Sequence, residues 1–209
     1  MKNSVFVFFL SVYVLVQLIK LSNAEPFEYM QFVLQYPLGV CYGTQKGDSK
    51  SPLPTKFTVH SIWPSNFSDT RVVCRQALIS HPFNNAQMTS SLQTDLTNSW
   101  PSVITKKSDM QFWQHEYEEH GACSVDKGVP LFTQKSYSER GNQLWNQYDI
   151  HALLDQSNIK PDSSKPCKMT EIVCNPKENR EKHTPVRRCK EDNKIYILRE
   201  VIICLDHQA

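Results

Sequence analysis

The sequence predicts an α+β fold, in which a central, mainly antiparallel sheet carries helices packed on it and disulfides stabilise the whole. Three observations lead to this prediction. Segments rich in β-branched residues lie near both ends of the chain, helical periodicity occupies its middle, and all seven cysteines follow the first 24 residues. With 40% hydrophobic residues in 209, the chain can bury the core of a single domain. Its composition excludes collagen-like, low-complexity and multi-span membrane proteins.

The beginning of the sequence has the pattern of a targeting signal. An apolar run at residues 5–19 follows Lys2 and ends before the small residues at 22–24. A membrane span needs about 20 apolar residues, so this run is short for one. We therefore interpret residues 1–24 as a signal peptide that is cleaved on secretion, with an uncleaved anchor as the alternative. Residues 25–209 then form a single extracellular domain.

The net charge of this domain is zero. The whole sequence holds 23 Lys and Arg against 21 Asp and Glu, and the signal peptide contains two of the basic residues and none of the acidic ones. Proteins that coat nucleic acid usually carry a clear basic excess. Capture of an anionic partner must therefore depend on local cations.

Two segments in the first part of the domain predict strands. Residues 32–36 and 57–63 are rich in aromatic and β-branched residues, and a proline follows each of them. Strict alternation along the second segment would place Val59 and Ser61 on one face of the sheet and His60 on the other.

The middle of the chain shows helical periodicity. Leucine or tryptophan recurs at every fourth position near the end of residues 89–100, as in an amphipathic helix. A second helix is expected to begin after an N-cap at Ser108 or Asp109 and to end at Gly121.

The last part of the chain predicts two further helices and more strand. The helices fit between residues 131 and 154, with Gly141 and Asp149 as interruptions. Residues 194–205 are rich in Ile and Val and predict a strand or a hairpin. The charged run over residues 177–194 is expected to be a solvated loop.

A cluster of ionisable residues in the second helix suggests a metal site, but its spacing argues against one. Six consecutive positions hold two histidines and three glutamates, namely His115, Glu116, Glu118, Glu119 and His120. His115 and His120 diverge by roughly 140° on a regular helix, whereas a zinc-binding helix needs histidines four residues apart. We therefore expect no metal and no other cofactor.

Acid–base chemistry fits these residues better. It needs two imidazoles from different elements that converge on one reacting atom, one neutral and one charged. His60 on a strand and His120 at a helix end can form that pair, and Glu116, four residues before His120, can orient its ring. Two histidines without a metal suit displacement at phosphorus by an internal hydroxyl, which RNA supplies as its 2′-OH.

Two blocks around these histidines resemble the active-site blocks of the ribonuclease T2 family. The first is His60–Pro64 and the second is Phe112–Cys123, and residues 32–37 and 203–206 are also similar to family segments. The resemblance implies a secreted endoribonuclease that cleaves single-stranded RNA by transphosphorylation to 2′,3′-cyclic phosphates. The chain is most similar to the plant S-ribonucleases of gametophytic self-incompatibility, with S-like defence ribonucleases as the alternative.

The resemblance also implies roles for individual residues. His60 and His120 form the acid–base pair, Glu116 assists at the charged intermediate, and His115 holds the phosphate. The residues implied to contact bases are Trp63, Gln35 and Phe112.

Covalent features and partners follow from the same resemblance and from one motif. The resemblance implies a disulfide between Cys74 and Cys123. The pairing of the other cysteines stays open, namely Cys41, Cys167, Cys174, Cys189 and Cys204. The only sequon predicts a glycan on Asn66. The implied partner of this monomer is RNA, with no membrane association, and a pollen F-box protein is a further partner if the chain is an S-ribonuclease.

The sequence departs from the family pattern at two positions of the active-site blocks. Ser61 replaces a glycine, and Glu119 replaces a lysine that would neutralise the developing phosphorane. We expect weakened activity or rescue by another cation, for which the candidates are Lys127, Arg71 and Arg75. The neighbouring glutamates should also raise the pKa of nearby imidazoles. The alternative is a catalytically impaired secreted RNA-binding or recognition protein on the same fold.

Overall fold

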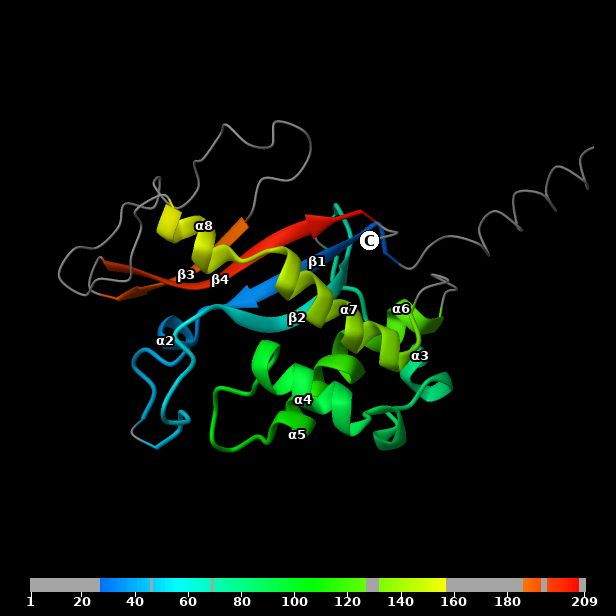
Figure 1. Ribbon diagram of the computed structural model, residues 1–209. Helices are drawn as coiled ribbons and strands as arrows, with labels where there is room; N and C mark the ends of the chain where they lie inside the picture. The colour runs from blue at the N-terminus through cyan, green and yellow to red at the C-terminus, as the bar shows by residue number, and fades with distance from the viewer. Residues whose placement is uncertain are drawn as a thin grey trace, which may run out of the picture.

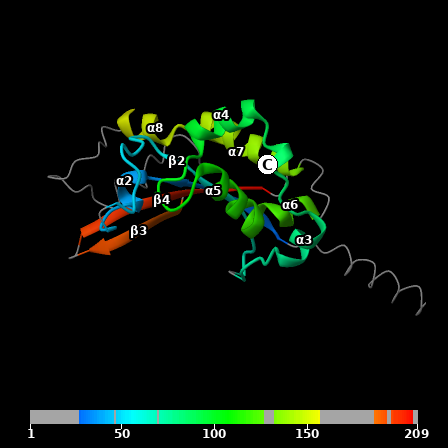
Figure 2. The same ribbon diagram turned by 90° about the horizontal axis from the view of Figure 1, so that it is seen from below.

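The computed structural model describes residues 27–45, 47–68, 70–126, 132–156, 186–192 and 195–206. Within these residues, four antiparallel strands form one sheet in the order β2-β1-β4-β3. Most of the helices gather on the side of the sheet where β2 lies, and β3 forms the opposite edge (Figures 1 and 2). This arrangement confirms the predicted α+β architecture. In the described part of the chain, no helix has the length and hydropathy of a membrane span, and the expected signal peptide lies outside that part.

The sheet is organised around β1, Tyr29–Gln35, which pairs with β2, Thr58–Ser65, on one side and with β4, Ile195–Leu205, on the other. Alternate residues of β1 are fully buried in the main core, namely Met30, Phe32 and Leu34. Gln35 and its partner Glu200 belong to the opposite face, because neighbouring residues of a strand point to opposite faces.

A β-bulge interrupts the pairing of β1 with β2 at His60. Val33 pairs with Ser61 and Leu34 pairs with Val59, so His60 has no partner on β1. Val33 and Leu34 are neighbours and point to opposite faces, and Val59 and Ser61 therefore do so as well. The expectation that Val59 and Ser61 share a face is wrong, because the extra residue shifts the alternation.

The two helices predicted in the middle of the chain are present, and the second begins at one of the two caps expected for it. Thr89 caps α4, Ser90–Ser99, and Ser108 caps α5, Asp109–Glu116, in a capping box with Gln111. Each cap satisfies backbone N–H groups that the first turn leaves unpaired. The cap at Ser108 fixes where α5 begins and hence which of its residues face the sheet.

The second of these helices does not end at Gly121. It continues into a π-helical turn, η2, Tyr117–Gly121, and then into α6, Ala122–Asp126. The expected stop is wrong because Gly121 serves close packing instead, since a Cβ there would collide with the rings of Tyr117 and Tyr137.

The two later helices are α7, Gln134–Gln147, and α8, Ile150–Gln156. Gly141 does not interrupt α7, so that expectation is wrong. A Cβ at Gly141 would collide with the indole of Trp100, so the glycine allows α7 to approach α4 closely. Asp149 does separate the helices, and its carboxylate accepts a hydrogen bond from a backbone N–H of α8 at 2.9 Å.

The C-terminal strand is one arm of a hairpin. β3, Val186–Asp192, pairs antiparallel with β4. The single-strand alternative for residues 194–205 is therefore confirmed, and the hairpin partner of this strand comes from residues 186–192, for which the expectation of a solvated loop is wrong. The remainder of that run lies outside the described residues.

The remaining elements are short. α2, Pro37–Val40, packs on β4, while α3, Arg75–Ser80, and the 3-10 turn η1, Asn85–Gln87, lie between β2 and α4 in the chain.

The predicted disulfide is present. Cys74, which precedes α3, is bonded to Cys123 on α6. The Cys41 thiol is buried and donates a hydrogen bond to the carbonyl of Val103. Cys167 and Cys174 lie outside the described residues, so their predicted part in the cysteine pairing stays open.

Candidate active site

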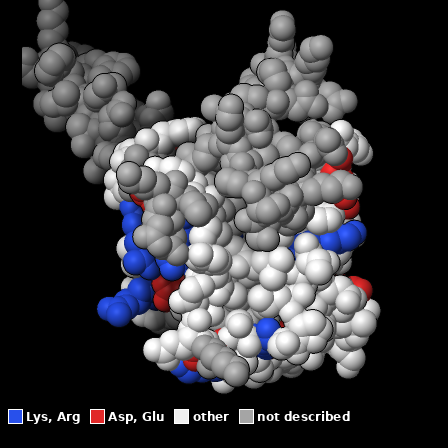
Figure 3. Space-filling model, turned by 90° about the vertical axis from the view of Figure 1, so that its left-hand side faces the viewer, with Lys and Arg blue, Asp and Glu red and all other residues white. Residues whose placement is uncertain are grey.

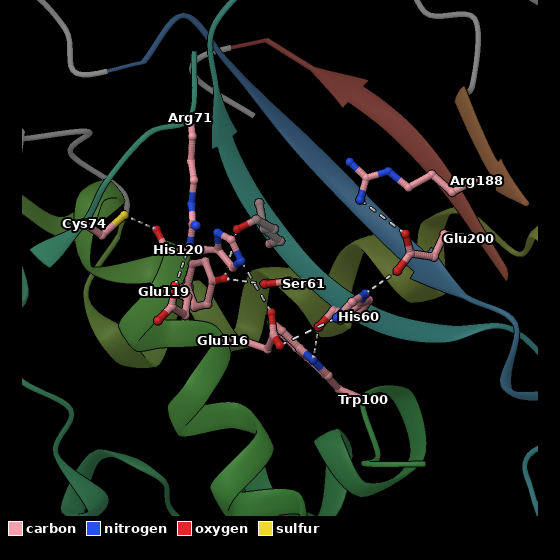
Figure 4. Close-up of polar contacts among 12 residues, drawn as sticks. His60, Ser61, Arg71, Cys74, Trp100, Glu116, Glu119, His120, Arg188 and Glu200 are labelled. Atoms are coloured by element: carbon pink, nitrogen blue, oxygen red, sulfur yellow. Dashed lines mark hydrogen bonds and ion pairs between the residues drawn. The ribbon is translucent and has the colours of Figure 1, made fainter. Parts of the chain in front are cut away.

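His60, Glu116 and His120 converge beside β2, as the sequence predicted (Figure 4). Oε1 of Glu116 lies 3.7 Å from Nε2 of His60, and Oε2 lies 3.9 Å from Nε2 of His120. One carboxylate thus stands between two imidazoles from different elements, which is the arrangement that paired acid–base chemistry requires.

Irregular backbone places both histidines. His60 is the unpaired residue of the β-bulge in β2, and His120 lies in the π-helical turn η2. Bulges and π-turns each insert an extra residue and change where the following side chains point, and both recur next to functional sites. The carbonyl of His60 is also held by the indole N–H of Trp100 at 2.7 Å.

Glu116 is a buried carboxylate with an exposed fraction of 3%. Burial raises the pKa of Glu116, and the positive charge of His60 and a hydrogen bond from Ser61 oppose that shift. The hydroxyl of Ser61 also lies 3.1 Å from the hydroxyl of Tyr137. The side chain that replaces the family glycine therefore belongs to the polar network under the histidines.

His120 is largely enclosed, and its electrostatics differ from the expectation. Burial lowers the pKa of His120 to about 3, with further lowering by the positive charges of His60, Arg71 and His115. The expectation that nearby glutamates raise the pKa of the imidazoles is wrong for His120, because desolvation of the charged ring outweighs them. At neutral pH, His120 is an unprotonated imidazole.

A second carboxylate, Glu200, contacts His60 from β4. Its Oε1 lies 2.6 Å from Nδ1 of His60, and its Oε2 lies 3.4 Å from Arg188 on β3. Sequence reasoning missed both residues. They lie 140 and 128 positions from His60 in the chain (200 − 60 and 188 − 60), so only the pairing of β4 and β3 with the sheet brings them near. The charge of Glu200 within an otherwise apolar strand was the available signal.

Glu119, which replaces the family lysine, forms an ion pair with Arg71. Its Oε2 lies 2.9 Å from a guanidinium nitrogen of Arg71, and Figure 4 shows this pair beside His120. Both side chains are substantially exposed. Of the other candidate cations, Arg75 is exposed on α3, and Lys127 lies outside the described residues.

A cavity of about 210 Å³ opens beside the histidines. Its walls include Trp63, His120 and Asn66, together with the two arginines Arg71 and Arg188. The indole of Trp63 lies 5.4 Å from the ring of His60 and 5.2 Å from that of His120, measured between centroids. The guanidinium of Arg188 covers the Trp63 ring at 4.8 Å.

The other residues predicted to bind substrate differ in exposure. Gln35 is buried, and its amide donates a hydrogen bond to the carbonyl of Val59 at 3.4 Å. Phe112 is also buried and stacks on His60 with 5.9 Å between ring centroids. His115 is exposed on α5. Their substrate roles stay predictions.

Charged side chains are unevenly distributed on one face of the molecule (Figure 3). On the face shown in Figure 3, Lys and Arg gather along the margin with acidic side chains among them, and most of the face is uncharged. The two arginines at the cavity therefore provide local positive charge next to the histidines.

The chain is similar to known proteins in sequence and in structure. Residues 27–209 match the model of the ribonuclease T2 family. A ribonuclease-like storage protein of Panax ginseng is 29% identical over 178 residues, covering 84% of this chain and 70% of that protein. Ribonuclease S-7 of Nicotiana alata is 31% identical over 139 residues, covering 65% of this chain and 58% of that protein. The structure of ribonuclease MC1 from bitter gourd seeds is similar with a TM-score of 0.73 and 29% identity, covering 87% of this chain and 90% of that one.

Proposed function

The chain belongs to the ribonuclease T2 family and is a ribonuclease of that type, and we propose that it cleaves single-stranded RNA by histidine acid–base catalysis to give 2′,3′-cyclic phosphates. The observation that carries this proposal is the convergence of His60, Glu116 and His120, with 3.7 Å and 3.9 Å between the carboxylate and the two Nε2 atoms. The substrate must be RNA, because the nucleophile is a 2′-hydroxyl.

The two histidines are proposed to have different roles. His120 is neutral at pH 7, because burial lowers its pKa to about 3, and so can accept the proton of the 2′-OH. His60 faces the carboxylates of Glu116 and Glu200, which are partners for a positive charge on its ring. The 2′-oxygen attacks phosphorus, the bond from phosphorus to the 5′-oxygen breaks, and the imidazolium of His60 gives its proton to that oxygen.

The cavity beside the histidines suits a nucleotide base. Trp63 presents an aromatic ring at its wall, and stacking on such a ring contributes about 1–3 kcal/mol per base. Gln35 and Phe112 are proposed to contact a second base, and His115 a phosphate. The burial of Gln35 and Phe112 means that such contact requires their side chains to become more accessible.

The biological setting is also part of the proposal. Residues 1–24 act as a signal peptide, residues 25–209 form one secreted, monomeric domain, and Asn66 carries a glycan. We also propose that the protein is a pistil determinant of self-incompatibility recognised by pollen F-box proteins, and the similarity to ribonuclease S-7 of Nicotiana alata supports its placement with proteins named as S-ribonucleases. An S-like defence ribonuclease is the alternative.

Two histidine variants test the proposed chemistry. We expect His60→Ala and His120→Ala each to lower the rate of RNA cleavage by about 10² to 10⁴, because each removes one proton-transfer group. The measurement is single-turnover cleavage of a dinucleotide, with the cyclic phosphate identified by mass spectrometry. His151→Ala is the control, because His151 pairs with Asp155 on α8, outside the site. Full activity of either active-site variant would contradict the proposal.

A second candidate function is a recognition or storage protein with impaired catalysis. Two observations favour it, namely the acidic Glu119 at the position of the family lysine and the similarity to the ginseng ribonuclease-like storage protein. An in-gel ribonuclease assay of the purified protein distinguishes the two functions. RNA cleavage that His120→Ala abolishes excludes the second, and absence of cleavage by the wild type supports it.

A further inference from the structure

Glu200 approaches His60 across the sheet. It lies on β4, opposite Gln35 of β1, and its side chain reaches beyond β1 to the bulge of β2 (Figure 4). The side chain has an exposed fraction of 12%. The contact of 2.6 Å between Oε1 and Nδ1 is therefore a largely enclosed, charge-assisted hydrogen bond.

This hydrogen bond engages Nδ1 of His60 and so leaves Nε2 as the nitrogen that can contact substrate. A carboxylate only accepts hydrogen bonds, so Nδ1 must carry the proton that Glu200 binds. The other nitrogen, Nε2, then faces Glu116 at 3.7 Å, on the side where His120 lies. The ring is thus fixed in orientation and tautomer, as a second group fixes a histidine in other acid–base pairs.

Arg188 keeps Glu200 charged and in place. It pairs with Glu200 in the register of β3 and β4, and its guanidinium lies 3.4 Å from Oε2. Burial alone would raise the pKa of Glu200, but the hydrogen bond from His60, the charge of His60 and the charge of Arg188 lower it below its ordinary value. The same guanidinium covers the Trp63 ring, so Arg188 links Glu200 to the cavity wall.

We propose that Glu200 is a positioning residue for His60, which accepts the hydrogen bond of Nδ1–H and so holds Nε2, with its proton, toward the scissile phosphate. The inference rests on the proposed function and adds to it a residue from the C-terminal hairpin. Four charged or titratable groups surround His60 directly or through one of its carboxylate partners, namely Glu200 from β4, Arg188 from β3, Glu116 from α5 and His120 from η2.

Three substitutions of Glu200 separate the effect of its charge from the effect of its hydrogen bond. Glu200→Gln retains an oxygen that can accept the hydrogen bond but removes the charge, and Glu200→Ala removes both. Glu200→Asp retains the charge on a shorter side chain. Glu191→Gln is the control, because Glu191 is an exposed carboxylate on the same hairpin.

We expect kcat for RNA cleavage to fall by about 10² in Glu200→Ala and by about tenfold in Glu200→Gln, with KM nearly unchanged in both. Nitrogen NMR at a pH where the His60 ring is neutral should show the Nδ1–H tautomer in wild type, and a mixture of tautomers in Glu200→Ala. Glu200→Asp recovers part of the lost kcat.

The outcomes that overturn the inference differ from those that overturn the proposed function. An inactive wild type contradicts the proposed function, and the NMR measurement still tests the contact between Glu200 and His60. An active wild type, with kcat unchanged in folded Glu200→Gln, or with kcat and tautomer unchanged in folded Glu200→Ala, overturns the positioning role alone. If Glu200→Ala does not fold, Glu200→Gln decides, because it conserves shape and the accepting oxygen.

Discussion

At the scale of single residues, the replacement of the family lysine by Glu119 is offset by a neighbour. The carboxylate of Glu119 puts a negative charge at the lysine position, but its Oε2 accepts a hydrogen bond from the guanidinium of Arg71 at 2.9 Å. Arg71 and His120 both line the cavity. A cation thus remains near the proposed phosphate position, supplied by a different part of the chain. Of the two candidate cations that the structure describes, Arg71 is the one whose placement supports rescue.

The first residue-scale prediction concerns this arginine. We expect Arg71→Gln to lower the rate of RNA cleavage by about tenfold, less than the 10² to 10³ lost with an enclosed donor, because solvent screens an arginine whose side chain is 76% exposed. Glu119→Lys should recover the loss in the Arg71→Gln background, since it supplies the missing cation. Steady-state cleavage of a dinucleotide measures both effects.

Arg75→Gln is the matched control for this experiment. Arg75 is also an exposed arginine, but it lies on α3 and is not among the residues that line the cavity. Equal losses in Arg71→Gln and Arg75→Gln would mean that only overall charge matters, and the specific role of Arg71 would be wrong.

Sequence reasoning found the central residues because their signals are local. His60, Glu116 and His120 lie in compact motifs, and the spacing of Glu116 and His120 places them on one helix face. Glu200 and Arg188 have no such motif, and their role depends on the register of β1, β3 and β4. Register pairs segments that are far apart in the chain, so a local motif does not reveal which side chains it brings together.

At the scale of elements, the site depends on a close approach between α7 and α4. Gly141 of α7 lies against the indole of Trp100, which follows α4. The indole N–H of Trp100 in turn holds the carbonyl of His60 at 2.7 Å. Periodicity predicted α4, and two helices were expected between residues 131 and 154. The sequence could not show that Gly141 serves packing rather than a break, because that depends on the helix that faces it.

The element-scale prediction is that Gly141→Ala lowers both stability and activity. Alanine favours a helix by about 1 kcal/mol over glycine, but the collision of its Cβ with the Trp100 ring costs about 1–3 kcal/mol. We expect a net loss of about 1 kcal/mol in urea unfolding, and a lower cleavage rate because Trp100 shifts the backbone of His60.

The control for this variant lies on the exposed side of the same helix. Gln143→Ala removes an exposed side chain two residues away and should leave activity unchanged. A Gly141→Ala protein that is more stable and fully active would show that Trp100 can move without affecting His60.

At the scale of the whole molecule, buried ionisable groups make stability depend on pH. His120 has a pKa of about 3 in the folded protein, against an ordinary value of 6.5. Between these pH values, the unfolded chain binds a proton that the folded chain does not, so the contribution of His120 to stability is lost as pH falls. Glu116 acts in the opposite direction, because its raised pKa lets the folded protein bind a proton more readily.

The whole-molecule prediction compares a variant that lacks His120 with the wild type. The free energy of unfolding of His120→Gln should decrease less than that of wild type as pH falls from about 6.5 toward 3, because the variant lacks the group that must become charged on unfolding. Urea titrations at several pH values measure the difference. The control His151→Gln should follow the wild type, and equal slopes for His120→Gln and wild type would contradict the prediction.

The contact between Glu200 and His60 affects the order in which the parts of the candidate active site can form during synthesis. Synthesis proceeds from β2 through the helices to the hairpin, and the two contacting residues are separated by 140 positions. A partly synthesised chain that has reached α8 already holds both histidines and Glu116, but not the carboxylate that orients His60. Ring orientation is therefore completed by the pairing of β4 with β1, among the last contacts that the chain can form.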